Sequence, residues 1–413
     1  MAEAVKNSAP DIAACRADFP ALNRPDSPAY LDTAASAQKP RVVIDAMAQL
    51  MEGHYANIHR GLYAYSQKTT ESFEAARARV AVFVGAPDPR EIIFTRNATE
   101  AINLVAQSWA GTFLEDGDEI ILTEMEHHAN IVPWDLLRRK KNIVIRTIPV
   151  RDDGTLDLER FERMLTQKTK MVCLAHVSNA LGTVNPVHDV IAIARDFYPD
   201  MKILIDGSQA VVHGAVDLAF MGADFYVFTG HKLYGPTGIG VLWGRYALLN
   251  EMPPYQGGGD MIDHVAFDYV TFKDAPARFE AGTPAIIEAI GLAAAIAYLE
   301  TIGMETIAAH EADLLAYGMA RLGDIEGLHF YGLAENKAGI ISFTADWGHP
   351  SDIGMILDQC GVAVRTGHHC CQPLMARYGI DATVRASLGL YSDKGDIDAL
   401  AQGLEKAQRM LKG

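Results

Sequence analysis

The stretch Phe228-Thr229-Gly230-His231-Lys232-Leu233-Tyr234-Gly235-Pro236 continues an apolar segment that begins at Phe225. Residues 225–229 are typical of a buried strand, and the glycines that follow are typical of a tight turn. A lysine at the end of a buried strand is costly to desolvate as an ammonium ion. Desolvation also lowers its pKa, and the free amine can then form a Schiff base. Taken alone, Lys232 is better explained as a side chain that extends from the strand end into solvent.

Outward from this stretch, strand-like segments alternate with helical patterns. The other strand-like segments are residues 91–95, 119–123, 142–150, 171–176, 203–206 and 240–243. Several are apolar nearly throughout, as expected for strands buried on both faces of a mainly parallel sheet. Helical patterns occur between them, for example at residues 73–83, 98–109, 158–165 and 190–197. The alternation predicts an α/β fold in which crossover helices cover a mostly parallel, mixed seven-stranded sheet.

The pattern changes after an apolar helix predicted at residues 285–302, which we interpret as a hinge or spine. Beyond it we expect helices at residues 304–322, 351–360 and 394–411, and strands at 328–331, 339–344, 362–366 and 383–388. This order is typical of a separate α+β unit. We predict a large domain over residues 20–290 and a small domain over residues 1–19 and 291–413.

Composition restricts the function classes. The 413 residues are 49% hydrophobic, which suits a globular protein with a sizeable core. Lys and Arg number 36 and Asp and Glu 52, so the net charge is −16. An acidic chain of this kind lacks the basic face that nucleic-acid binding requires.

The cellular compartment is predicted from the cysteines and the N-terminus. Five cysteines, an odd and sparse set in a chain of this length, do not indicate a disulfide framework. Residues 1–10 contain no apolar segment of a secretory signal, and residues 285–299 are too short to cross a bilayer. We therefore expect a cytoplasmic protein in a reducing compartment.

A carboxylate follows the strand at residues 203–206, because Asp206 is its last residue and Gln209 lies three positions on. A pyridoxal-phosphate (PLP) site needs a carboxylate at the pyridine nitrogen and a lysine at the aldehyde carbon. Parallel strands that end at one edge of a sheet can place Asp206 and Lys232 together there. Considered singly, Asp206 is also a reasonable helix N-cap or turn residue.

The phosphate of such a cofactor needs hydrogen-bond donors. Residues 95–100 join a strand to a helix, where backbone N–H groups and the Thr99 hydroxyl suit an anion, although every helix needs a capping turn. Thr229 and His231 are further candidates. The chain has neither G-x-x-x-x-G-K-[ST] nor G-x-G-x-x-G after a strand, so nucleotide cradles are not supported.

Two histidines follow the strand at residues 119–123. An imidazole of His127 or His128 can stack on a cofactor ring and transfer protons, whereas adjacent side chains diverge and rarely share a metal ion. A partly buried, hydrogen-bonded histidine is the plain alternative.

Cys370 stands among cationic and partly cationic groups, since Arg365, His368 and His369 precede it within five residues. Such neighbours favour a thiolate, although an isolated cysteine near a strand end is most often a small buried hydrophobe. Residues 368–371 could also be considered as zinc ligands. Four consecutive ligands do not readily close a tetrahedron, and no C-x-x-C partner exists elsewhere, so we predict no metal.

These segments resemble a known family. Residues 228–236 look like the lysine motif of class V, fold-type I aminotransferase-like PLP enzymes, and Arg365-Thr366-Gly367-His368-His369-Cys370 resembles the cysteine motif of group II, SufS-type cysteine desulfurases. Further similar stretches, in order along nearly the whole chain, are residues 31–36, 57–61, 126–134, 176–179 and 278–283. The resemblance implies the fold-type I architecture, PLP as cofactor, and conversion of L-cysteine to L-alanine with a persulfide on Cys370.

The resemblance also implies roles for individual residues. Lys232 would hold PLP as a Schiff base, Asp206 would pair with the pyridine nitrogen, and Gln209 would contact the ring hydroxyl. His127 would stack on the ring and act in catalysis. The implied phosphate and cofactor contacts are Ala98, Thr99, Asn179, Thr229, His231 and Thr283; the implied substrate contacts are Arg385, Asn179 and Arg365. A planar guanidinium suits bidentate binding of the substrate carboxylate by Arg385.

The family further implies partners. Its members are homodimers, and Thr283 and Arg60 would be the residues contributed to the partner's site. A SufE-like or SufU-like carrier would take the sulfur into iron–sulfur cluster assembly. A selenocysteine lyase, another class V enzyme such as a transaminase, or an inactive scaffold for sulfur transfer are the alternative functions.

One position departs from the family pattern, because Cys371 stands where a small residue is usual. A second thiol beside a persulfide would be able to accept the sulfur or to form a vicinal disulfide.

Overall fold

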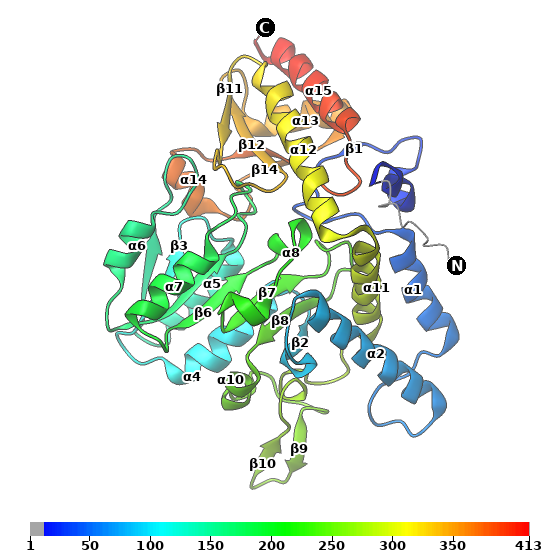
Figure 1. The fold of residues 1–413 in the computed structure, drawn as a ribbon, viewed down its shortest axis with the longest axis vertical. Coiled ribbons are helices and arrows are strands. Elements are labelled where there is room, and N and C mark those ends of the chain that lie inside the picture. The colour runs from blue at the N-terminus through cyan, green and yellow to red at the C-terminus, as the bar shows by residue number, and fades with distance from the viewer. Residues whose placement is uncertain (1–11, 413) are drawn as a thin grey trace, which may run out of the picture.

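The computed structural model describes residues 12–412, and its main feature is a seven-stranded sheet (Figure 1). In spatial order its strands are β2 (Ile92–Thr95), β8 (Gly240–Gly244), β7 (Phe225–Thr229), β6 (Lys202–Asp206), β5 (Thr169–Ala175), β3 (Glu119–Thr123) and β4 (Val144–Ile148). Only β8 runs antiparallel to its neighbours. The predicted mixed, mostly parallel sheet is confirmed, and six strands have their carboxyl ends at one edge.

Both faces of this sheet are buried, which explains why its strands are apolar nearly throughout. In β5, for example, Val172 and Leu174 belong to one hydrophobic cluster, while Met171 and Cys173 belong to another on the opposite face. The helices that contribute to the first cluster include α1 (Arg41–Gly53), α2 (Ala64–Phe83), α6 (Leu158–Met164), α7 (Val187–Phe197), α8 (Ala210–His213), α9 (Leu218–Met221) and α11 (Ile286–Ile302). Those of the second are α3 (Ala98–Leu104), the π-helical η4 (Val105–Ala110), α5 (Val132–Arg138) and α10 (Tyr246–Glu251), with the short α4 (Gly111–Phe113) after η4.

A second sheet lies in the C-terminal part of the chain. Its four antiparallel strands are, in order, β11 (Leu328–Tyr331), β12 (Ile340–Ala345), β15 (Thr383–Ser387) and β14 (Arg365–Gly367). Helices α12 (Met304–Gly323), α13 (Pro350–Gln359) and α15 (Lys394–Lys412) pack on it through a third hydrophobic cluster. The yellow-to-red region at the top of Figure 1 is this layer, and α14 (Gln372–Tyr378) lies between it and the large sheet. The predicted α+β unit is present, while the domain boundaries stay a prediction.

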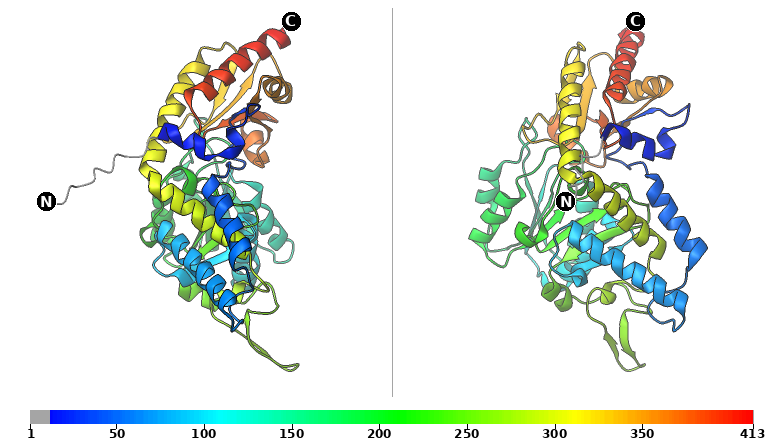
Figure 2. Two further views of the ribbon diagram at one scale, coloured as in Figure 1. Left: turned by 90° about the vertical axis from the view of Figure 1, so that its right-hand side faces the viewer. Right: turned by 45° about the vertical axis from the view of Figure 1, so that its right-hand side comes forward.

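The N-terminal segment joins the C-terminal layer. Arg16, in the 3-10 helix Ile12–Asp18, forms an ion pair of 2.7 Å with Asp396 of α15, and this segment lies beside α12 in Figure 2. Strand β1 (Ala29–Tyr30) pairs in parallel with β13 (Val362–Ala363), and Asp32 forms a bridge with Ser387 of β15. Residues 1–11, which include part of the predicted small-domain segment and the stretch tested for a secretory signal, lie outside the described residues.

Two parts of the prediction were wrong. Residues 362–366, expected as one strand, form β13 and β14, which belong to different sheets because the first pairs with β1 and the second with β15. The sequence reasoning also missed the hairpin of β9 (Ile262–Val265) and β10 (Val270–Phe272), which projects at the bottom of Figure 1. Its side chains are largely exposed, so burial imposes no apolar alternation on it.

No single helix within residues 12–412 has both the length and the apolar character to cross a membrane. Helices α11 and α12 would meet the requirement only together, and they are bent by 75° relative to one another.

Candidate active site

A pocket of about 230 Å³ lies at the edge where the parallel strands of the large sheet end. It is closed on its other side by the segment around Cys370 and by Arg385 of β15. The predicted site residues that line it are Ala98, Thr99, His127, Asn179, Asp206, Gln209, Thr229, His231, Lys232, Arg365, Cys370 and Arg385. The structure therefore brings together side chains that the sequence distributes over almost 290 residues, while the role of each stays a prediction.

Lys232 and Asp206 lie at the ends of neighbouring strands, because β6 ends at Asp206 and Lys232 lies three residues beyond β7. Lys232 is half-buried and lines the pocket, and burial lowers its pKa to about 8 against the opposing charge of Asp206. Asp206 is only 7% exposed and accepts a hydrogen bond of 2.9 Å from the N–H of Ser208. A lysine whose amine is readily uncharged thus faces the same cavity as a buried carboxylate.

An anion-binding corner adjoins this pair. The hydroxyl of Thr229 is buried and, among residues 12–412, has no hydrogen-bond partner. The first residues of α3, Ala98 and Thr99, line the same pocket, and Asn97 caps the helix by accepting the N–H of Glu100. Gly240 is needed beside them, because a Cβ there would come within 2.5 Å of the Asn97 backbone. An unsatisfied buried hydroxyl next to a helix start is a suitable environment for a phosphate group.

His127 lines the pocket as a neutral ring. Its Nδ1 accepts the N–H of Ala129 at 3.0 Å, so the proton of the neutral imidazole is on Nε2. Burial, and after it the charge of Lys232, lowers the pKa of His127 to about 4. At neutral pH this side chain therefore offers an aromatic face and one N–H donor.

Glu126, which was not predicted from the sequence, stabilises the loop that carries His127. Its fully buried carboxylate accepts hydrogen bonds from Thr123 Oγ1 at 2.5 Å, Asn130 Nδ2 at 2.6 Å and the N–H of Ala175 at 3.0 Å. Burial raises its pKa to about 7. These bonds connect the loop that carries His127 to the end of β5. In the sequence, this role of Glu126 is indicated by Asn130 four residues later, whose amide can donate to the carboxylate.

The guanidinium of Arg385 is almost completely buried in the pocket wall, with its side chain 2% exposed. Its Nη1 donates to the carbonyl oxygen of Asn179 at 2.7 Å, and its Nη2 donates to Asp32 Oδ1 at 3.2 Å. Arg365 also pairs with Asp32, through Nη2 and Oδ2 at 3.0 Å. In the sequence Asp32 stands out only as part of the family-like stretch 31–36, which does not predict its contact with both arginines.

Cys370 lies in an exposed loop with unusual backbone angles. His369 and Cys370 have φ values of 51° and 57°, in the region that non-glycine residues rarely adopt. The loop is tied to the large domain, because the N–H of His128 donates to the Cys370 carbonyl at 2.7 Å. The thiol is thus presented from a constrained turn at the pocket.

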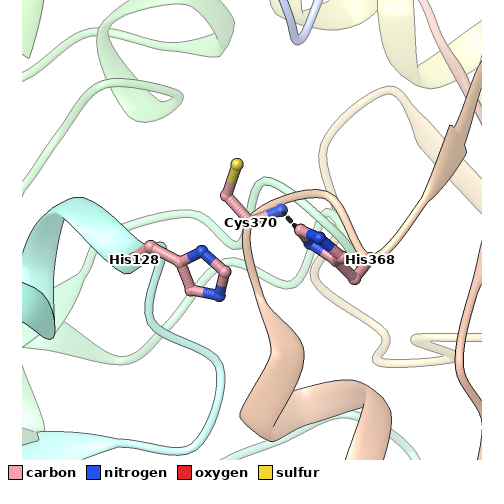
Figure 3. Close-up of side chains that lie close together, drawn as sticks. All are labelled: His128, His368 and Cys370. Carbon is pink, nitrogen blue, oxygen red and sulfur yellow. Dashed lines mark hydrogen bonds between the residues drawn. The ribbon is translucent and has the colours of Figure 1, made fainter.

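His128 and His368 flank Cys370 (Figure 3), and one ring nitrogen of each lies within 4.8 Å of the other and of the sulfur. A neutral imidazole has a single lone pair for a metal. In His128 it accepts the N–H of Gln372 at 3.2 Å, and in His368 the N–H of Cys370 at 3.1 Å. Burial, and then His368, lowers the pKa of His128. As folded, each ring uses its lone pair to accept a backbone N–H, so that lone pair is not free for a metal ion.

Cys371 is directed away from this loop and is fully buried, with its thiol donating to Asn179 Oδ1 at 3.1 Å. Burial raises the pKa of Cys371 to about 12, so it remains a thiol. A protonated, buried thiol is a poor sulfur acceptor.

We therefore expect Cys371→Ala to leave the amount of persulfide per chain unchanged, with Cys371→Ser as the control that retains a hydroxyl donor to Asn179. Persulfide is quantified by alkylation and peptide mass spectrometry after exposure to L-cysteine. A reduced yield in both variants, or sulfur found on Cys371 in the unmodified protein, would assign Cys371 a part in sulfur transfer.

Two residues implied to act across a dimer do not line this pocket in the single chain. Thr283 borders a separate cavity with Arg96 and Glu100, and Arg60 pairs with Asp260 at 2.8 Å. Their expected contribution to a partner's site stays a prediction.

The chain is similar to known proteins over almost its whole length. Residues 29–400 match the family model described as aminotransferase class-V. A cysteine desulfurase of Serratia proteamaculans is 48% identical over 400 residues, covering 96% of this chain and 98% of the relative. The corresponding protein of Escherichia coli K12 is 46% identical over 400 residues, with coverages of 96% and 98%.

Solved structures agree in fold. The cysteine desulfurase CsdA of Escherichia coli superposes with a TM-score of 0.91 at 37% identity, covering 98% of this chain and 100% of that chain. A cysteine desulfurase of Thermococcus onnurineus gives 0.91 and 37%, covering 97% and 98%. A lysine-to-alanine variant of C-DES, with glycine covalently linked to its PLP cofactor, gives 0.82 and 25%, covering 94% and 98%.

Proposed function

The chain belongs to the class V aminotransferase family and to the PLP-dependent cysteine desulfurases within it, and on this premise we propose that L-cysteine is converted to L-alanine with Cys370 as the sulfur acceptor. One observation supports the proposal above all others. Lys232 and Asp206, at the ends of adjacent strands, and Cys370, in the loop opposite, line a single pocket.

The residues of this pocket fit PLP. Lys232 would hold the aldehyde carbon, Asp206 the pyridine nitrogen, and the unsatisfied Thr229 hydroxyl with the start of α3 the phosphate. Gln209, which donates to the Ala34 carbonyl at 2.8 Å, and His127 would fix the ring from its edge and face. When bound, PLP supplies an electron sink for the Cα of an attached amino acid.

The remaining chemistry falls to side chains of this protein. Arg385 would bind the substrate carboxylate, with Asn179 beside it. The amine of Lys232, whose pKa is lowered to about 8, would in its uncharged form take the proton from the substrate Cα. His127 would donate from Nε2 to the reacting groups. The sulfur of Cys370 would attack the substrate sulfur, so that the carbon–sulfur bond breaks as the sulfur–sulfur bond forms. The products, alanine and a cysteine persulfide, balance without an external oxidant.

The proposed activity is tested by an absorption spectrum of the purified protein followed by addition of L-cysteine. We expect a visible band from bound PLP and release of alanine. A protein without such a band, or one that shows it but releases no alanine, would refute the proposal.

The pKa of Lys232 gives a pH-dependent expectation for protein from which PLP has been removed. Acylation of an amine requires the uncharged form, so labelling of Lys232 by acetic anhydride should rise with pH through a midpoint near 8. Asp206 raises this pKa, and therefore Asp206→Asn should move the midpoint lower. Peptide mass spectrometry measures the labelling. A midpoint near 10.4, the ordinary lysine value, would mean that the amine is not desolvated.

The place of this reaction in the cell is also proposed. The persulfide would pass to a SufE-like or SufU-like carrier for iron–sulfur cluster assembly, from a homodimer. The exposed loop position of Cys370 supports transfer to a second protein, because the sulfur must be reachable from outside.

A further inference from the structure

Asp32 is held at the back of the arginine pair by the backbone. It follows β1, where the Ser387 N–H donates to the Leu31 carbonyl at 2.7 Å and Asp32 bridges Ser387 in parallel. Arg385 is two residues away on that same strand. Asp32 thus lies behind the guanidinium groups of Arg365 and Arg385, which themselves line the pocket.

The carboxylate of Asp32 accepts from only one of the three guanidinium nitrogens of Arg385. One nitrogen, Nη2, contacts Asp32, and another, Nη1, contacts the Asn179 carbonyl. The Nε–H is buried and has no partner in the described part of the chain. Asp32 shares its charge with Arg365, which contacts it through two nitrogens at 3.0 to 3.3 Å. Two guanidinium charges and one carboxylate leave a net charge of about +1 at the pocket wall.

The burial of the three groups is unequal. Arg385 is 2% exposed, Asp32 17% and Arg365 49%. The pKa of Arg385 lies below its usual value because burial outweighs the opposing effect of Asp32. A desolvated cation with an unpaired N–H has a strong tendency to bind an anion, and within residues 12–412 Asp32 is the only acidic group paired with Arg385.

We infer that Asp32 is a positioning and specificity residue of the substrate-carboxylate subsite. It holds both arginines and reduces their combined charge to about +1, which the single carboxylate of a bound ligand then neutralises. This inference rests on the proposed role of Arg385 in binding the substrate. A ligand with a single carboxylate leaves the subsite neutral. A dianion brings a second negative charge close to Asp32 and is disfavoured.

The inference predicts an unusual direction of change. Removal of a buried carboxylate partner leaves its cation uncompensated, and a bound anion relieves that condition. The nearly isosteric Asp32→Asn should therefore be less stable than the unmodified protein without ligand, yet it should bind acetate about tenfold more tightly. Its preference for acetate over malonate should also decrease.

The test uses the holoenzyme at constant ionic strength, with acetate and malonate as probes and the melting temperature as the readout. Titration gives a dissociation constant for each anion without any turnover, so it stays informative even if L-cysteine is not the substrate. Asp32→Glu keeps the charge and should restore the unmodified preference. Asp152→Asn, which removes the exposed carboxylate paired with Arg377, is the matched control and should change neither constant.

The outcomes separate the two roles. If Asp32 only stabilises the fold, Asp32→Asn will have a lower melting temperature and an equal or weaker affinity for acetate. That result would overturn the inference. Asp32→Ser serves in the same titration if the asparagine variant does not fold. In catalysis, the inference predicts a lower KM for L-cysteine in Asp32→Asn, and a KM that is unchanged or raised would contradict it.

Discussion

Replacing Lys232 with alanine is expected to remove the visible band of covalently held PLP and to lower alanine formation by about a thousandfold or more. Both effects have one physical cause, because the same amine would attach the cofactor and move the proton at the substrate Cα. The measurements are an absorption spectrum after gel filtration and an assay of alanine.

Lys337 offers a matched control. Burial lowers its pKa to about 8 as well, but its amine donates to the carbonyl oxygens of Leu181 and Gly332 and lies outside the pocket. Lys337→Ala should therefore retain the band, although it will cost stability. A Lys232→Ala protein that keeps covalently bound PLP would show that another lysine holds it.

The second large effect is expected from Cys370→Ala, which should keep the PLP band and lose persulfide formation completely. Cofactor attachment depends on the large sheet, whereas Cys370 lies on a loop whose only proposed role is to receive sulfur. Spectra and persulfide-specific alkylation separate the two properties.

Cys360→Ala is the comparison variant, since this half-buried cysteine follows α13 and does not line the pocket. It should form persulfide normally. Persulfide found in the Cys370→Ala protein would show that a different thiol accepts the sulfur.

Much of the large domain could be predicted because burial on both faces makes its strands apolar. Strand β6 was expected at residues 203–206 and spans Lys202–Asp206, and β7 was expected at its observed bounds. Hydrophobic periodicity does not indicate which sheet a strand joins, so residues 362–366 were wrongly predicted as one strand. Nor does it reveal the β9–β10 hairpin, which is not buried and has a fully exposed Phe267 at its tip.

The proximity of Lys232 and Asp206 was predictable for a general reason, namely that parallel strands end at the same edge of a sheet. The contacts of Asp32 were not, because 353 residues separate it from Arg385 and the pairing arises from the meeting of two sheets. The role of Glu126 was not predicted for a related reason. Its partners are local or lie on β5, and a carboxylate beside two histidines is not recognisable as buried from the sequence alone.

The approach of His128 to Cys370 likewise depends on tertiary structure. Along the sequence His128 lies far from residues 368–371, whereas the structure brings it next to His368 and Cys370. The hydrogen bonds of the two rings, rather than spacing in the sequence, indicate what this group can bind.

In the proposed reaction, sulfur passes from L-cysteine directly to Cys370 in a pocket organised by Lys232 and Asp206. The most direct measurement is a single addition of one equivalent of L-cysteine per chain, with no reductant, followed by assay of alanine and peptide mass spectrometry of all five cysteines. We predict one alanine released and one sulfur atom gained, on the peptide that contains Cys370. Alanine accompanied by free sulfide and an unaltered Cys370, or sulfur on any other cysteine, would contradict the claim.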